Sequence, residues 1–174
     1  MYDLKTPEYS FTVIDSNPSE IIFTPFGITE VIMGEYRLSE RELKSYDYCN
    51  CIALAGVGRQ VSLLGHFEGI IEPNRGDHRQ FKQALAALQT IVKPELIVLA
   101  GGKCDYDDGE ISKTLALHDR SFALANVNAL LLDQHTAQGV PELVVSWSTS
   151  LADSVDIFVS NTLKQVVCSQ THQP

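Results

Sequence analysis

The segment that most constrains the fold is the apolar run Cys49–Gly56, CNCIALAG. It is too short for a typical isolated helix, nearly all of its side chains are apolar, and further glycine follows it, so it is typical of a buried strand that closes in a turn. A second strand is predicted over Gln60–Phe67. In the resulting β-hairpin, the start of the first strand lies near the end of the second.

Beyond Asp77 the apolar residues recur at the three- and four-residue spacing of an amphipathic helix, which is expected to end at Lys93–Pro94. The residues that carry this spacing are Phe81, Ala84, Leu85, Leu88 and Ile91. A compact buried strand follows over Glu95–Ala100 and stops at Gly101–Gly102. A second helix is predicted within Asp119–Gln134.

The other predicted elements are mostly strands. They are Phe11–Asp15, Glu20–Thr24, Ile28–Tyr36, a short helical turn over Ser39–Leu43, and final strands over Glu142–Trp147, Val155–Val159 and Leu163–Cys168. Strands and helices mix without strict alternation, which predicts an α/β fold: one layered domain whose mixed, partly antiparallel sheet packs with helices. Residues 1–27 are expected to form an N-terminal extension of short strands, 28–168 the domain, and 169–174 a frayed tail.

Composition limits the possible partners. The 174 residues carry a formal net charge of −9 and are 44% hydrophobic, which suits a packed core and gives phosphate backbones no clustered positive charge to bind. We therefore expect no nucleic-acid partner. No run of residues is long and apolar enough to predict membrane insertion, and Met1–Asp15 lacks the pattern of a secretory signal. The expected location is cytoplasmic, with export that needs no cleaved signal left open.

The chemistry most readily assigned to this sequence involves Cys51 and His66, which the hairpin brings together from its entrance and exit. A thiol with an ordinary pKa of about 8.5 is only slightly ionised at neutral pH, and an imidazole that takes its proton turns it into a nucleophile. The alternative interpretation is a buried structural cysteine and a histidine packed at a turn.

The stretch from Val31 to Phe67 resembles the CheD family, bacterial enzymes that deamidate or demethylate glutamine-derived side chains of chemotaxis receptors. Gly34-Glu35-Tyr36 is similar to one family element, Cys51 stands at the position of the nucleophile, and Gly65-His66-Phe67 is similar to a third element. Leu99–Gly102 resembles the family's strand that ends in Gly-Gly. The segment His66–Gly69 is also reminiscent of protein N-terminal asparagine amidohydrolases. The likeness covers roughly residues 28–135.

This resemblance implies a CheD-like deamidase fold and a cysteine-dependent hydrolase that acts on a side-chain carboxamide of a protein substrate. Cys51 would be the nucleophile and His66 the general base and acid. The family has a threonine six residues before the cysteine, where Ser45 stands here and would orient the histidine. Asn50 replaces the family's serine and, with Gly101 and Gly102, would help to form the oxyanion and substrate site. No cofactor is implied.

Two other functions remain open from the sequence. The chain can be a catalytically silent CheD-like module that recognises a partner's side chain in the same pocket. It can also bind zinc through Cys49, Cys51, His66 and Cys104, although the single C-x-C pair differs from the usual zinc spacing. The sequence does not predict the oligomeric state or the identity of the protein substrate.

Overall fold

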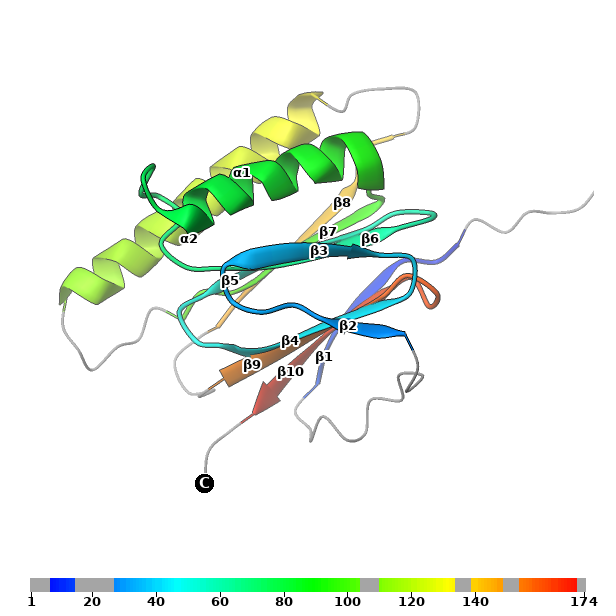
Figure 1. The fold of residues 1–174 in the computed structure, drawn as a ribbon, viewed down its shortest axis with the longest axis horizontal. Coiled ribbons are helices and arrows are strands. Elements are labelled where there is room, and N and C mark those ends of the chain that lie inside the picture. Colours follow the sequence, from blue (N-terminus) through cyan, green and yellow to red (C-terminus); the bar gives the residue numbers. More distant parts are fainter. Residues whose placement is uncertain (1–6, 15–26, 104–109, 134–138, 149–153, 172–174) are drawn as a thin grey trace, which may run out of the picture.

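The computed structural model describes residues 7–14, 27–103, 110–133, 139–148 and 154–171. Within them the chain forms two five-stranded sheets, each of which mixes parallel and antiparallel pairs, and two long helices. Figure 1 shows three layers, with the helices over one sheet and the second sheet beneath it. The elements are β1 Ser10–Ile14, β2 Ile28–Glu30, β3 Glu35–Ser39, β4 Glu42–Tyr48, β5 Ile52–Val57, β6 Ser62–Phe67, α1 Gly76–Ala87, the π-helical turn η2 Leu88–Val92, β7 Leu96–Gly101, α2 Glu110–Asp133, β8 Glu142–Trp147, β9 Ser154–Ser160 and β10 Gln165–Thr171.

The middle layer is the sheet of order β3-β6-β5-β7-β8, and its three central strands are buried along their whole length. Burial on both faces explains why these strands have almost continuous apolar sequences. Strands β5 and β6 pair antiparallel around the turn at 58–61, as the sequence predicts, and β7 pairs antiparallel with β5 on the other side.

The outer layer is the sheet of order β1-β10-β9-β4-β2. Its strand β4 is paired antiparallel with β9 and has an irregular register between Ser45 and Tyr48. Asp47, which lies inside this irregularity, has a φ of 61°, and its N–H donates to the carboxylate of Asp156. The irregularity belongs to the strand that leads into Cys51.

Two hydrophobic cores separate the three layers. Alternate residues of β5 and β6, such as Ala53 and Leu64, pack against Leu43 and Ile157 of the outer sheet. The residues between them point the other way and pack beneath the helices, as Phe67 does against Phe81 with ring centroids 5.5 Å apart. The middle sheet therefore has one face toward each core.

The structure confirms the α/β class and the mixed sheet character, and it divides the strands between two sheets rather than one. The predicted strand Ile28–Tyr36 is interrupted: β2 ends at Glu30, and β3 begins only after the turn that contains Gly34, with a φ of 88°.

The helical turn predicted over Ser39–Leu43 is wrong. Ser39 ends β3 and accepts a hydrogen bond from the N–H of Arg41, and β4 begins at Glu42. A local side-chain bond at a strand turn has the same sequence pattern as a helix cap.

Two helix details also differ from expectation. Ile91 is 56% exposed because the helix widens to π geometry at Leu88–Val92, which rotates the later positions out of the core face. Helix α2 begins at Glu110, nine residues before the predicted start. Its exposed apolar residues, among them Ile111, obscure the helical pattern there.

Some predicted features lie outside the described residues, namely the strand Glu20–Thr24, Cys104 and residues 172–174 of the expected tail. Of the expected N-terminal extension, the described strand β1 pairs with β10 in the outer sheet. No helix in the described part of the chain is long and apolar enough to cross a membrane.

Candidate active site

The β5–β6 hairpin positions Cys51 and His66 on one face of the middle sheet. Ala53 is paired directly with His66, and Cys51 stands two residues before Ala53, so it occupies the diagonal position on the same face. Both side chains lie toward the core between the two sheets, and each residue is only 3% exposed. The hairpin predicted from the sequence thus brings the two residues to neighbouring positions.

His66 is held through its Nδ1 atom by Ser45 of β4, whose Oγ lies 2.9 Å away. The same hydroxyl donates its one hydrogen to the carbonyl of Val31 at 2.6 Å. Toward His66, Ser45 therefore acts as an acceptor, and we assign the ring proton to Nδ1. In the neutral ring, Nε2 then carries a lone pair.

The His66 Nε2 atom is buried and has no hydrogen-bond partner within the described part of the chain. Tyr48 stacks on the ring, with centroids 3.8 Å apart and an angle of 17° between the planes, and its hydroxyl donates to the carbonyl of Gly65. Burial lowers the pKa of His66 to about 4, although Asp47 acts in the opposite direction. The ring is neutral at pH 7 and therefore has an unused proton acceptor.

Cys51 is also neutral in this arrangement. Burial is the main reason that the pKa of its thiol is raised to about 12, and the negative charges of Glu68 and Asp77 raise it further. The Sγ atom lies 3.8 Å from Sδ of Met33, and none of the described contacts is a hydrogen bond between Cys51 and His66. At rest the pair consists of a thiol and a neutral imidazole.

Gly101 and Gly102 lie against the backbone of Cys51 at the end of β7. Gly101 has a φ of 81°, and a Cβ atom at this position would lie 2.6 Å from the Cys51 carbonyl oxygen. The Gly102 N–H donates to the same oxygen at 2.8 Å. The pair therefore fixes the chain at Cys51, and the Gly102 N–H is occupied in this state instead of facing a substrate.

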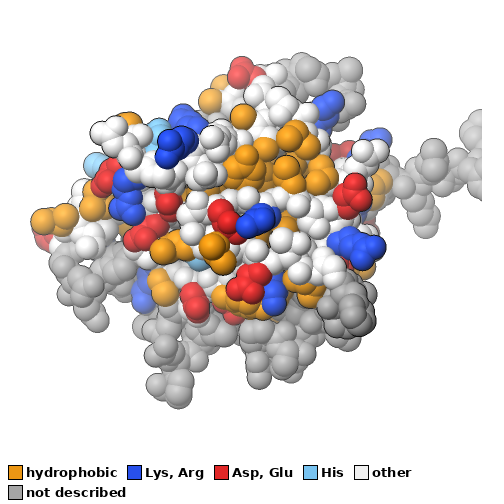
Figure 2. All heavy atoms as spheres, viewed as in Figure 1, with side chains coloured by type: hydrophobic (Ala, Val, Ile, Leu, Met, Phe, Trp, Pro, Cys, Tyr) orange, Lys and Arg blue, Asp and Glu red, His pale blue; other side chains and the backbone are white. Residues whose placement is uncertain are grey.

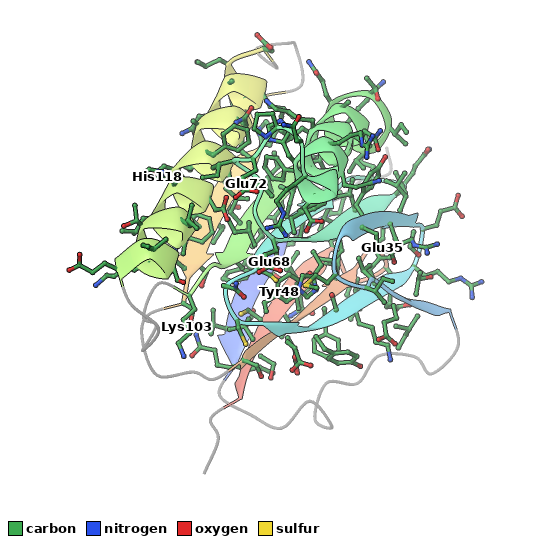
Figure 3. All side chains as sticks on the ribbon, turned by 60° about the vertical axis from the view of Figure 1, so that its left-hand side comes forward. Glu35, Tyr48, Glu68, Glu72, Lys103 and His118 are labelled. Carbon is green, nitrogen blue, oxygen red and sulfur yellow. The ribbon has the colours of Figure 1, made fainter. Side chains whose placement is uncertain are left out.

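Asn50 connects the cysteine to a neighbouring pocket. Its side-chain nitrogen donates to Oε1 of Glu68 at 3.0 Å, directly after β6 ends, and Figure 3 marks Glu68, Tyr48 and Glu72 in this region. The pocket has a volume of about 240 Å³ and extends under the N-terminal half of α2. Its lining is partly acidic and consists of Asn50, Glu68, Gly69, Ile71, Glu72, Arg75, Ser112, Leu115, Ala116 and Asp119.

The buried strand predicted over Cys49–Gly56 begins later than expected, because β5 begins only at Ile52. Cys49 instead lies in the bend after the irregular part of β4, where its N–H donates to Asp47 and its carbonyl accepts from Lys103. No cluster of three or more metal-binding side chains occurs among the described residues, and Cys104, the remaining member of the predicted zinc set, lies outside them.

Three residues of this site were not identified from the sequence. Tyr48 covers the His66 ring, Met33 touches the Cys51 sulfur, and Glu68 binds Asn50. The roles of Tyr48 and Met33 depend on contacts between separate elements, which spacing along the chain does not encode.

Comparison with models of known protein families gives no match for this chain, and no curated protein is significantly similar to it in sequence. The functional assignment therefore rests on the geometry of the site and on the motifs.

Proposed function

We propose that this protein is a cysteine-dependent protein deamidase of the CheD-like class, which hydrolyses a side-chain carboxamide of glutamine or asparagine in a protein substrate. The observation that best supports the proposal is the buried, unpartnered Nε2 atom of His66, on the same sheet face as Cys51. A buried acceptor without a partner costs free energy, so it is the kind of feature that functional sites retain.

The proposed reaction uses the neutral pair as it stands. When a carboxamide approaches Cys51, His66 Nε2 takes the thiol proton and the sulfur adds to the amide carbon. The proton then passes to the departing nitrogen, ammonia leaves, and a thioester remains on Cys51. Water hydrolyses the thioester with His66 again as base, which returns the thiol and converts the carboxamide into a carboxylic acid.

Ser45 and Tyr48 support this step without touching the reacting atoms. The Ser45 hydroxyl keeps the proton on Nδ1 and so leaves Nε2 as the acceptor, and it accepts more strongly from the imidazolium that forms. The Tyr48 ring, stacked on His66, restricts the orientation of the imidazole. Both are positioning residues in this proposal.

The oxyanion requires donors near Cys51, and we assign part of this role to the side-chain amide of Asn50. The amide now donates to Glu68, so it must exchange that partner for the substrate oxygen. Gly101 and Gly102 contribute by fixing the Cys51 backbone.

The test is to incubate the purified protein with candidate proteins and to search for a mass gain of about one unit per modified side chain, together with released ammonia. Wild type should produce both, and Cys51→Ala and His66→Ala should produce neither above background. Cys168→Ala is the matched control, since Cys168 is an equally buried thiol in the same core. Ammonia release by Cys51→Ala at the wild-type rate would overturn the proposal.

A catalytically silent binding module is the second candidate, and the burial of Cys51 favours it. Site-resolved labelling with iodoacetamide separates the two functions. A catalytic Cys51 should react faster in the wild type than in His66→Ala, whereas equal rates in both proteins would support the module.

A further inference from the structure

One neighbouring side chain lies against the Cys51 sulfur. Met33 lies in the turn between β2 and β3, and its Sδ atom is 3.8 Å from the Cys51 sulfur. Cys51 is 3% exposed and Met33 is 58% exposed. A half-exposed side chain in contact with a buried thiol lies on the solvent side of that thiol. Met33 therefore covers the sulfur.

The backbone on both sides of Met33 is fastened to the candidate site. Before it, the Val31 carbonyl accepts the Ser45 hydroxyl hydrogen at 2.6 Å. After it, the Gly34 N–H donates to the His66 carbonyl at 2.7 Å. Because these bonds hold the turn, the unbranched methionine side chain, which has several rotatable bonds, is the part most free to move.

We propose that Met33 is a displaceable cover that determines access to Cys51, and that a substrate must move its thioether aside before the thiol can react. The identity of the displacing group as a carboxamide-bearing segment rests on the proposed function. The covering role itself does not, because it follows from the contact and from the burial of both residues.

Displacement would also make the thiol more reactive. Burial is the largest cause of the raised pKa of Cys51, and moving Met33 admits water to the sulfur. The cover thus links binding to activation: the thiol stays protonated and protected until a ligand occupies the place of the methionine side chain.

Ile32 supplies a matched control. It is the neighbouring residue of the same turn and is 60% exposed, and its hydrogen bonds, both with Glu35, use only its backbone. Removing its side chain shortens the apolar tip of the turn by a similar amount and leaves the sulfur covered.

The experiment measures the alkylation rate of each cysteine by iodoacetamide at pH 8 to about 9, followed by peptide mass spectrometry, in the full-length protein. Met33→Ala should raise the Cys51 rate about tenfold or more, and Met33→Leu, which restores most of the volume, should stay within about threefold of wild type. Ile32→Ala should leave the rate unchanged. Cys168, buried elsewhere in the same core, should stay unreactive in all variants and reports on loss of the fold.

Equal Cys51 rates in wild type and Met33→Ala, with Cys168 still protected, would overturn the proposal. Glu35→Ala tests the competing explanation that the whole turn opens, because Glu35 accepts the Ile32 N–H. If Glu35→Ala accelerates the labelling of Cys51 and Met33→Ala does not, access to Cys51 depends on opening of the backbone turn and not on the Met33 side chain. The labelling rates require no deamidase activity, so faster labelling of Cys51 in Met33→Ala supports the cover even where the ammonia assay rejects the proposed function.

Discussion

Ser45 has one hydroxyl hydrogen, which it donates to the Val31 carbonyl, and this choice determines the tautomer of His66. The imidazole has to donate from Nδ1, which leaves Nε2 bare on the side of the middle sheet where Cys51 lies. The tautomer of His66 in the candidate site therefore depends on one hydrogen bond between two uncharged groups.

Replacing Ser45 with alanine tests that dependence. Ser45→Ala leaves the buried Nδ1–H without an acceptor, so we expect a loss of about 1–3 kcal/mol of folding free energy. Nitrogen NMR of the ring should change from the single Nδ1–H tautomer to a mixture, and deamidation should fall about tenfold. Ser45→Thr keeps the hydroxyl and should retain the wild-type tautomer. An unchanged tautomer in Ser45→Ala would contradict the assignment.

The lowered pKa of His66 predicts a pH dependence of stability. Its folded pKa of about 4 lies below the ordinary value of 6.5, so below pH 6.5 the unfolded chain binds a proton that the folded chain excludes. The stability that comes from keeping the His66 ring neutral is fully present above pH 6.5. It is lost as the pH falls toward 4, which lowers the free energy of unfolding by on the order of 2–3 kcal/mol.

Urea unfolding of wild type and of His66→Gln at several pH values measures this effect. The difference between the two proteins should become smaller or reverse as the pH falls from about 6.5 to about 4. Other carboxyl groups, including Asp119 and Asp156, titrate in both proteins and cancel in the difference. Parallel curves would show that the ring does not change its protonation preference on folding.

Among the elements, the end of β7 is as important to the site as the hairpin that carries it. Gly101→Ala combines an unfavourable positive φ with a contact of 2.6 Å to the Cys51 carbonyl oxygen. We expect a loss of about 2–4 kcal/mol in thermal or urea unfolding, together with altered Cys51 labelling.

Gly139→Ala is the control for backbone strain alone. Gly139 has a similar φ of 89°, and a Cβ atom there meets nothing within 4 Å, so the expected cost is about 1 kcal/mol and Cys51 should be unaffected. Equal losses of stability in the two variants would show that the contact with the Cys51 carbonyl does not contribute to the cost of Gly101→Ala.

The elements that the sequence predicted well share one physical property. Strands β5, β6 and β7 are buried on both faces, and α1 packs one face on the sheet, so their hydrophobic patterns are dominated by burial. The ends of the short edge strands β2 and β3 depend on the turn at Gly34 and on the hydrogen bond that Ser39 accepts from Arg41. From the hydrophobic pattern alone, the turn cannot be told from a longer strand, or the Ser39 hydrogen bond from a helix cap.

The candidate site follows the same division. The hairpin was predicted from the sequence, and so was the proximity of Cys51 and His66, whereas the register that places Ala53 opposite His66 was not. The contacts of Tyr48 and Met33 depend on how β4 and the turn after β2 fold over the hairpin, which involves residues from another sheet. Such packing has no local signal in the chain.

At the scale of the whole molecule, the net charge of −9 is the main electrostatic feature. Acidic and basic side chains are interspersed on the face shown in Figure 2, so the negative charge does not gather in a single acidic patch there. Near the site, the pocket beside Asn50 is lined by Glu68, Glu72 and Asp119 against the single cation Arg75.

This charge predicts faster reaction with lysine-rich target segments at low salt. Deamidation of such a segment should slow severalfold between about 50 and 300 mM salt, because screening shortens the range of the attraction. A neutral segment with the same carboxamide serves as control and should show little change. A flat profile for both would remove electrostatic steering from the mechanism.

The parallel pairing of β1 with β10 has a consequence for biosynthesis. Ser10 lies opposite Gln165, so β1 can pair only after β10, which lies far later in the sequence, has been synthesised. The β5–β6 hairpin and β7, by contrast, are complete much earlier. The hairpin and β7 can therefore pair during translation before β9 and β10 of the outer sheet have been made, and Cys51 stays incompletely covered by that sheet until those strands are synthesised.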